Sequence, residues 1–246
     1  MNLPGKSAAG AVVKSGDVAD DLAERGRAFC WACRRAQSTC LCAEVRPFQA
    51  AFVPIILLHP RESKKRVGTA SIIRRCITNA QVIVGTGEQL ERDAAFLKIV
   101  DDPDLQPCVL FPGKQSFNLS EGGAAAIEGR LDSQRKLVIF VVDGTWPQAQ
   151  KMVHVNARLR ALPRLSFTTA MLSQYRIRKQ PAAHCLSSLE AIHVLMETLA
   201  VSPRFPLPPQ AGHRNLLESF NRMVERQLVF ENEGRKHAKY SRPAAD

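Results

Sequence analysis

The sequence predicts an α/β fold in which a mostly parallel sheet is flanked by helices. Short apolar runs rich in β-branched residues alternate with amphipathic segments along most of the 246 residues. The apolar runs are unbroken, which is typical of strands buried on both faces of a sheet. With 45% hydrophobic and 23% charged residues, the chain can bury one sizeable core.

The apolar runs predict the strands of this sheet. They lie at residues 52–58, 81–85, 107–113, 136–142 and 164–169. The run KLVIFVV at 136–142 has the most continuous apolar character, so we expect it at the centre of the sheet.

Helices are expected between and after these runs. They lie at residues 62–76, 89–100, 145–162, from 187 onward and at 213–230, with loop and polar helix at 114–136. Two of them begin with a capping box, Thr145 with Gln148 and Ser187 with Glu190. The second box explains Glu190 without a function, although this residue is also a weak candidate for contact with a substrate.

The sequence divides into four expected parts. We expect a flexible leader at 1–25, a zinc knuckle at 26–46, an α/β domain at 47–232 that contains the predicted strands and helices, and a basic flexible tail at 233–246. No internal repeat is evident.

The charge indicates a polyanionic partner. The net charge of +11 and the pI near 9.7 favour binding to phosphates, with release of their counterions. No segment has the pattern of a basic amphipathic helix with aromatic anchors, so nucleic acid is favoured over an anionic membrane surface. An apolar run long enough to cross a bilayer and a signal-peptide pattern are both missing, which predicts a cytoplasmic protein.

Four of the seven cysteines are crowded into a short segment. Cys30, Cys33, Cys40 and Cys42 offer enough thiolates to surround one tetrahedral Zn²⁺ ion. Four protein ligands leave no open position for water, so such a metal is structural. The alternative is a set of unliganded thiols.

Polar and small residues follow each of the first four apolar runs, where an open parallel sheet binds its ligands. His59 follows the first run, Gly85 the second, and Phe111 with Pro112 the third. Asp143 follows the fourth run and is either held rigidly at a reaction centre or serves as a local turn carboxylate. Trp146 either stacks on a base or packs against the protein.

Basic residues in three places are candidates for contact with RNA. They flank the cysteines, lie on the outer face of the helix at 62–76 and occupy a loop with one aromatic residue; the alternative for each is a solvated charge. The candidates are Arg34, Arg35, Lys64, Lys65, Tyr175, Arg176 and Lys179.

The order and spacing of these motifs resemble the DTW-domain family. The resemblance rests on Cys30 to Cys42, His59-Pro60-Arg61-Glu62, Gly68-Thr69, Phe111-Pro112-Gly113, Asp143-Gly144-Thr145-Trp146, Tyr175 to Pro181 and Leu186 to Ala191. It covers residues 27 to 230. Relative to the family pattern, a glycine separates Asp143 from Thr145, and Ser188 stands where Thr is often found.

The resemblance implies a tRNA-uridine aminocarboxypropyltransferase. Such an enzyme moves the 3-amino-3-carboxypropyl group of S-adenosylmethionine to N3 of uridine and leaves methylthioadenosine. A relation to SPOUT-type proteins implies a knotted chain at the cofactor site. Asp143 and Trp146 are then the catalytic candidates. The cofactor-binding candidates are Leu58, His59, Gly85, Phe111, Pro112, Asp143, Gly144, Thr145 and Arg178.

Two other functions fit the same sequence. A SPOUT-type RNA methyltransferase would produce S-adenosylhomocysteine, and a non-catalytic zinc-knuckle protein would bind RNA without consuming a cofactor. The target uridine, the oligomeric state and the exact role of Asp143 are left open by the sequence.

Overall fold

The computed structural model describes residues 28–33, 35–65, 68–178 and 185–240, with only the backbone described for 233–240. The chain divides into two compact units, residues 1–40 and 41–246. In the smaller unit, β1 (Phe29–Cys30) pairs antiparallel with β2 (Arg35–Ala36), and the short helix η1 (Gln37–Thr39) follows. The leader expected at 1–25 lies outside the described residues.

The larger unit is built on a six-stranded sheet in which every paired strand is parallel, which confirms the predicted α/β class. The strand order is β4-β3-β7-β5-β8-β6. In chain order the strands are β3 (Val53–Leu58), β4 (Gln81–Val84), β5 (Leu105–Leu110), β6 (Phe117–Asn118), β7 (Lys136–Asp143) and β8 (Arg164–Ser166). The sequence predicts all of these except the two-residue β6.

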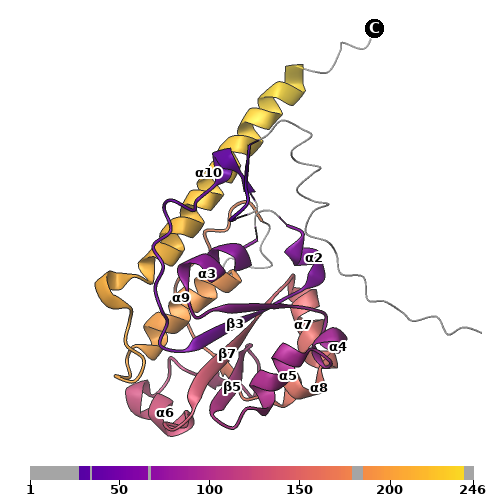
Figure 1. Ribbon diagram of the computed structural model, residues 1–246. Coiled ribbons are helices and arrows are strands. Elements are labelled where there is room, and N and C mark those ends of the chain that lie inside the picture. The colour runs from indigo at the N-terminus through magenta and orange to yellow at the C-terminus, as the bar shows by residue number, and fades with distance from the viewer. Residues whose placement is uncertain (1–27, 34, 66–67, 179–184, 241–246) are drawn as a thin grey trace, which may run out of the picture. The chain divides into compact units, whose positions relative to one another are not determined.

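Helices cover both faces of the sheet (Figure 1). One layer contains α3 (Ala70–Cys76), α6 (Gly123–Arg130), α9 (Ser188–Leu199) and α10 (Arg214–Tyr240). The other layer contains α4 (Gly87–Leu90), α5 (Ala94–Asp101), α7 (Trp146–Val155) and α8 (Ala157–Ala161). Alternate residues of the central strands enter the two cores, so Ile139 faces the first layer and Phe140 the second.

Three predicted helices are wrong as continuous elements. The segment 62–76 forms α2 (Pro60–Ser63) and α3, and the segment 89–100 forms α4 and α5. The segment 145–162 is broken between α7 and α8 at Asn156, which is fully buried. Its side chain accepts a hydrogen bond from the Leu159 N–H at 2.7 Å and donates one to the Gly87 carbonyl at 2.9 Å. Asn156 therefore caps a new helix.

The final helix is longer than its apolar pattern predicts. We expect its end near residue 230, whereas α10 continues to Tyr240, into the segment predicted as a tail. Its first half packs on α3 and α9. No helix within the described residues combines the length and the apolar character needed to span a membrane.

The register of the central strands brings their carboxyl ends together. Leu58, the last residue of β3, pairs with Asp143, the last residue of β7, and with Val84 of β4. Two further backbone hydrogen bonds extend this alignment: the His59 N–H donates to the Asp143 carbonyl at 2.9 Å, and the Gly85 N–H donates to the Leu58 carbonyl at 3.1 Å. The residues that follow the strands therefore meet at one edge of the sheet.

Candidate functional site

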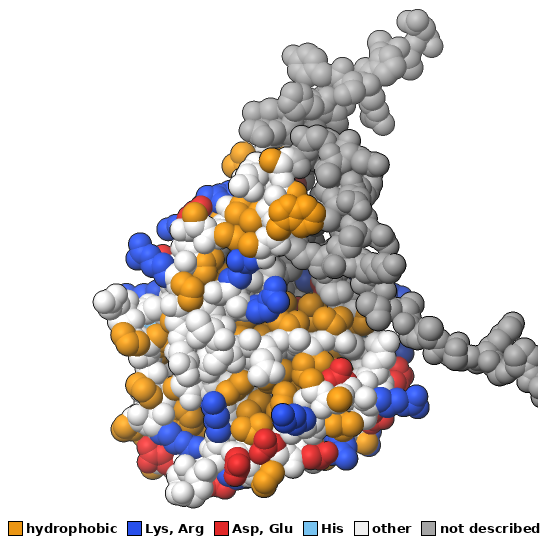
Figure 2. All heavy atoms as spheres, viewed as in Figure 1, with side chains coloured by type: hydrophobic (Ala, Val, Ile, Leu, Met, Phe, Trp, Pro, Cys, Tyr) orange, Lys and Arg blue, Asp and Glu red, His pale blue; other side chains and the backbone are white. Residues whose placement is uncertain are grey.

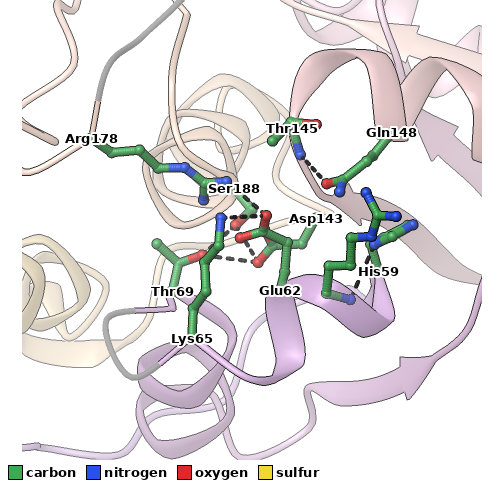
Figure 3. Close-up of polar contacts among 10 residues, drawn as sticks. His59, Glu62, Lys65, Thr69, Asp143, Thr145, Gln148, Arg178 and Ser188 are labelled. Atoms are coloured by element: carbon green, nitrogen blue, oxygen red, sulfur yellow. Dashed lines mark hydrogen bonds and ion pairs between the residues drawn. The ribbon is translucent and has the colours of Figure 1, made fainter.

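Asp143 lies at the centre of the strand-end site. It ends β7, is 8% exposed, and receives hydrogen bonds from two hydroxyls that come from different helices. Thr69, immediately before α3, donates to Oδ2 at 2.9 Å, and Ser188, in the first turn of α9, donates to the same oxygen at 3.0 Å. The two hydroxyl oxygens are 2.6 Å apart. Figure 3 shows this group together with its charged neighbours.

The surroundings of Asp143 have opposing effects on the pKa of its carboxyl. Burial, the largest effect, raises the pKa of its carboxyl, because a charged group loses hydration there. The hydrogen bonds from Thr69 and Ser188 lower this pKa, and the nearby Glu62 carboxylate raises it. Asp143 is therefore a buried carboxyl whose ionised form depends on two hydroxyl donors.

A second buried carboxylate, Glu62 of α2, holds two cations. Its side chain is 3% exposed, and Oε1 lies 2.7 Å from Lys65 Nζ and 2.9 Å from Arg178 Nη2. Nη2 of Arg178 is buried, and the ion pair with Glu62 holds the guanidinium beside Asp143. The site thus contains a cation fixed by a buried carboxylate.

Glu190 fixes the loop that carries Arg178. This residue of α9 is fully buried, and its Oε2 accepts from the Ser187 N–H at 2.8 Å, which confirms the predicted capping box. Its carboxylate also accepts from the Ser173 hydroxyl at 2.9 Å and the Gln174 N–H at 2.7 Å. Glu190 therefore joins α9 to the start of the 173–178 loop, a role that the capping box alone does not predict.

An aromatic pair lies beyond β5 and β7. The rings of Phe111 and Trp146 are stacked, with centroids 5.5 Å apart and planes at 2°. Trp146 begins α7 and is 44% exposed, so one packing partner leaves much of the indole accessible. Phe111 is half-buried, and the Arg164 guanidinium lies 6.0 Å from its ring centre.

The remaining cofactor candidates also lie around the strand ends. His59 Nδ1 accepts from the Arg61 N–H at 3.2 Å, and burial together with the Arg61 charge lowers the pKa of His59. The Gln148 side chain accepts from the Thr145 N–H at 2.7 Å. A Cβ at position 144 would lie 3.1 Å from Gln148 Cβ, so this tight turn favours glycine. Leu58 and Gly85 are buried, and Pro112 is exposed.

The structure separates the RNA candidates into different groups. Lys64 and Arg176 are exposed, and Lys65 is bound to Glu62. Tyr175 lies in the core, with its ring centre 5.1 Å from that of Phe220, and burial raises its pKa to about 12. Arg35 lies in β2, and Arg34 and Lys179 lie outside the described residues.

The four clustered cysteines converge. Their Sγ atoms all lie within 4.8 Å of one another, and Cys33 Sγ is 3.7 Å from Cys40 Sγ. Zn–S bonds of about 2.3 Å give an edge of roughly 3.8 Å in a tetrahedron, so this thiol pair has a fitting separation. Hydrogen bonds from the Cys33 backbone and from Cys40 lower the pKa of Cys30 to about 6. The seven cysteines, all of which lie within the described residues, form no disulfide bond.

Sequence reasoning missed three residues of the site as functional candidates. Thr69, Ser188 and Glu62 all lie within motifs that carry the family resemblance, but no local pattern indicates that they face Asp143. The signal that can find them is a hydroxyl or carboxylate adjoining a helix start, because helix starts meet strand ends in an open sheet.

Comparisons with known proteins identify relatives of this chain. A mouse (Mus musculus) protein named tRNA-uridine aminocarboxypropyltransferase 2 is 33% identical over 72% of this chain and 58% of its own length. Proteins with the same name from Macaca fascicularis and Drosophila melanogaster are 30% and 28% identical, over 80% and 71% of this chain and 66% and 67% of their own lengths.

The chain therefore spans 58% of the length of the mouse relative. No solved structure matches the chain. The DTW domain family matches residues 27–228, which include the strand-end site and the cysteine cluster. The chain therefore belongs to the DTW-domain family.

Proposed function

We propose that this protein transfers the 3-amino-3-carboxypropyl group of S-adenosylmethionine to N3 of a uridine in tRNA and releases methylthioadenosine. Family membership and the names of the relatives support a tRNA-modifying transferase. The observation that carries the proposal is the buried Asp143 carboxyl, oriented by Thr69 and Ser188 and followed three residues later by the accessible indole of Trp146.

The residues around Asp143 fit the amino acid end of the donor. S-adenosylmethionine supplies a carbon made electrophilic by its sulfonium, and its amino acid end carries a carboxylate and an ammonium. The Arg178 guanidinium, held in place by Glu62, suits the carboxylate, as does the start of α7 at Thr145. Asp143 offers a carboxylate to the ammonium or to the acceptor base.

The adenosine is assigned to the edge formed by the strand ends. Leu58, Gly85 and Phe111 supply apolar surface and backbone groups there, with His59, Pro112 and Gly144 beside them. Holding both ends of the donor aims one of the three carbons on sulfur at the acceptor, and this choice of carbon decides which group is transferred.

Asp143 is proposed to accept or orient the uridine N3 proton. This proton is weakly acidic, with a pKa of about 9, so a carboxylate with a raised pKa is a better partner for it than an ordinary one. The Thr69 and Ser188 hydroxyls have two effects: they lower the pKa of Asp143 and so favour its ionised form, and they fix the direction of its carboxylate. An oriented base therefore needs both donors.

The acceptor RNA is proposed to lie across the aromatic pair and the basic side chains. A base can stack on the exposed part of Trp146, whose ring is already held parallel to Phe111. On the face shown in Figure 2, Lys and Arg side chains are spread among apolar and acidic ones over the region of the sheet and its helices. The exposed Lys64 and Arg176 are assigned to phosphates, and Tyr175 supports its loop from the core. Arg34, Arg35 and Lys179 stay predictions.

Cys30, Cys33, Cys40 and Cys42 are proposed to hold a structural Zn²⁺ ion. The four thiols fit its preference for soft tetrahedral ligands and leave no position for water. Clustered cysteines that bind a metal suit a reducing compartment, so we also propose a cytoplasmic location. We further propose the divisions 26–46 and 47–232 and a SPOUT-like knot. The insertion of β7 between β3 and β5 is compatible with that knot.

The proposed reaction is tested by its two products. Purified protein is incubated with S-adenosylmethionine and unmodified tRNA, and the digested nucleosides and the small-molecule products are identified by mass spectrometry. We expect aminocarboxypropyl-uridine and methylthioadenosine. S-adenosylhomocysteine with a methylated nucleoside would support the methyltransferase alternative, and binding of tRNA without consumption of the donor would support the non-catalytic one.

A further inference from the structure

A second cluster of ligand-type side chains lies where α9 meets the start of α10. His193 and Glu197 are one turn apart on α9, so their side chains share a face of that helix. His213 immediately precedes α10, and its ring is stacked on that of His193 with centroids 5.2 Å apart. The two imidazoles are buried, at 5% and 2% exposure, and the Glu197 side chain is 50% exposed.

The two imidazoles point their Nε2 atoms at the same carboxylate oxygen. Glu197 Oε1 lies 3.4 Å from His193 Nε2 and 3.5 Å from His213 Nε2, and the three ligand atoms all lie within 4.8 Å of one another. Zinc bonds of about 2.0–2.2 Å to nitrogen and oxygen give tetrahedral edges of roughly 3.3–3.6 Å. The two separations, 3.4 and 3.5 Å, therefore lie within the range expected between two ligands of one tetrahedral Zn²⁺ ion.

The second ring nitrogen of His193 is engaged as in a metal ligand. Nδ1 lies 3.4 Å from the His213 backbone carbonyl, which can only accept a hydrogen bond. A neutral ring that donates from Nδ1 presents the lone pair of Nε2 to Glu197. Zinc-bound histidines commonly donate their other N–H to a carbonyl in this way, which sets the tautomer.

The separation of 3.4 Å between His193 Nε2 and Glu197 Oε1 is long for a hydrogen bond. A cation bound between these two atoms would contact both of them.

His213 is unsatisfied as well. Its Nδ1 is buried without a hydrogen-bond partner among the described residues, and its Nε2 makes only the long 3.5 Å approach to Glu197. Buried polar atoms are normally paired, and an unpaired one indicates an absent partner or ion. Two buried imidazoles therefore converge on the half-exposed Glu197 carboxylate, and the imidazoles lack enough hydrogen bonds to account for their burial.

We propose that His193, Glu197 and His213 bind one Zn²⁺ ion, separate from the cysteine cluster. The half-exposed Glu197 places the fourth position toward solvent, where a water can complete the tetrahedron. The ion would join the second half of α9 to the start of α10. Because α9 begins with the Ser188 hydroxyl that orients Asp143, a fixed α9 would also support the strand-end site.

The test is the zinc content of the full chain, which does not depend on the proposed reaction. Wild type and variants are equilibrated with a slight excess of Zn²⁺, desalted and measured by mass spectrometry of the metal together with the protein concentration. Glu197→Gln keeps the size of a half-exposed side chain and removes its charge. Glu225→Gln on α10, also exposed, is the matched control.

We expect Glu197→Gln to bind one zinc fewer per chain than wild type and Glu225→Gln to bind as many as wild type. Equal zinc contents in wild type and Glu197→Gln would overturn the proposal. X-ray absorption at the zinc edge gives a second readout. A chain with Cys30, Cys33, Cys40 and Cys42 changed to serine should retain one zinc with only nitrogen and oxygen neighbours, and a zinc-free chain would contradict the site.

Discussion

The Ser188 hydroxyl donates a hydrogen bond at 3.0 Å to the carboxylate of Asp143, 45 residues earlier in the chain. It shares the Oδ2 atom with the Thr69 hydroxyl, so the start of α9 and the residue before α3 together set the direction of one buried carboxyl. Both hydroxyls lower the pKa of that carboxyl, against the effect of burial. Removing either hydroxyl should therefore raise this pKa.

Replacing Ser188 with alanine should move the acidic limb of the pH–rate profile to higher pH. Loss of the donor raises the pKa of Asp143, and the ionised form is the one proposed to take the N3 proton. Ser188→Thr, which keeps a hydroxyl, should restore the wild-type profile. The measurement is kcat/KM across pH with saturating donor. If the rate is lower by the same factor at every pH and the acidic limb does not shift, Ser188 has only a packing role.

Replacing Asp143 with asparagine should change how stability depends on pH. A carboxyl with a raised folded-state pKa favours folding at low pH, and that contribution is lost as pH rises through the folded pKa. Asp143→Asn has no carboxyl at this position, so its stability does not fall for this reason as pH rises. The difference in Tm between Asp143→Asn and wild type should therefore be more positive at about pH 8 than at about pH 4, near the pKa of an unfolded aspartate. A difference that is constant with pH would contradict the raised pKa.

Replacing Arg178 with glutamine should weaken donor binding. The Arg178 guanidinium is assigned to the donor carboxylate, and a lost hydrogen bond to a charged group costs about 1.5–3 kcal/mol, or roughly tenfold or more in KM for S-adenosylmethionine. The control is Arg176→Gln, two residues away and exposed, which should leave this KM unchanged and alter only the KM for tRNA. Equal effects of Arg178→Gln and Arg176→Gln on the KM for S-adenosylmethionine would contradict the role proposed for Arg178.

Replacing Trp146 with alanine should reduce activity with little loss of stability. The indole is 44% exposed, and a base stacked on an aromatic ring contributes about 1–3 kcal/mol. We expect kcat/KM for tRNA to fall roughly 10- to 100-fold, with Trp146→Phe recovering most of it. Leu172→Ala, another exposed apolar residue, is the control for surface loss. A large drop in Tm would show instead that Trp146 is a packing residue.

The sequence predicts the elements of this fold better than their interruptions. Runs such as KLVIFVV identify β7 because burial on both faces demands unbroken apolar residues. The break at Asn156 escapes prediction because its buried amide is held by a partner 69 residues away, the Gly87 carbonyl. The same limit applies to the site. Asp143 can be predicted from its place after a buried strand, whereas Thr69 and Ser188 are brought to it by packing of α3 and α9.

The carboxylate of Asp143 is the group on which the proposed reaction depends most, and turnover by Asp143→Asn tests its role most directly. The measurement is kcat for nucleoside formation with saturating donor and tRNA, compared with Asp101→Asn, an exposed carboxylate paired with Arg158. General acid–base groups contribute about 10²–10⁴ in rate, so we predict that kcat falls at least about 100-fold in Asp143→Asn and stays at the wild-type value in the control. Near-normal turnover by folded Asp143→Asn would contradict the proposed role of this site.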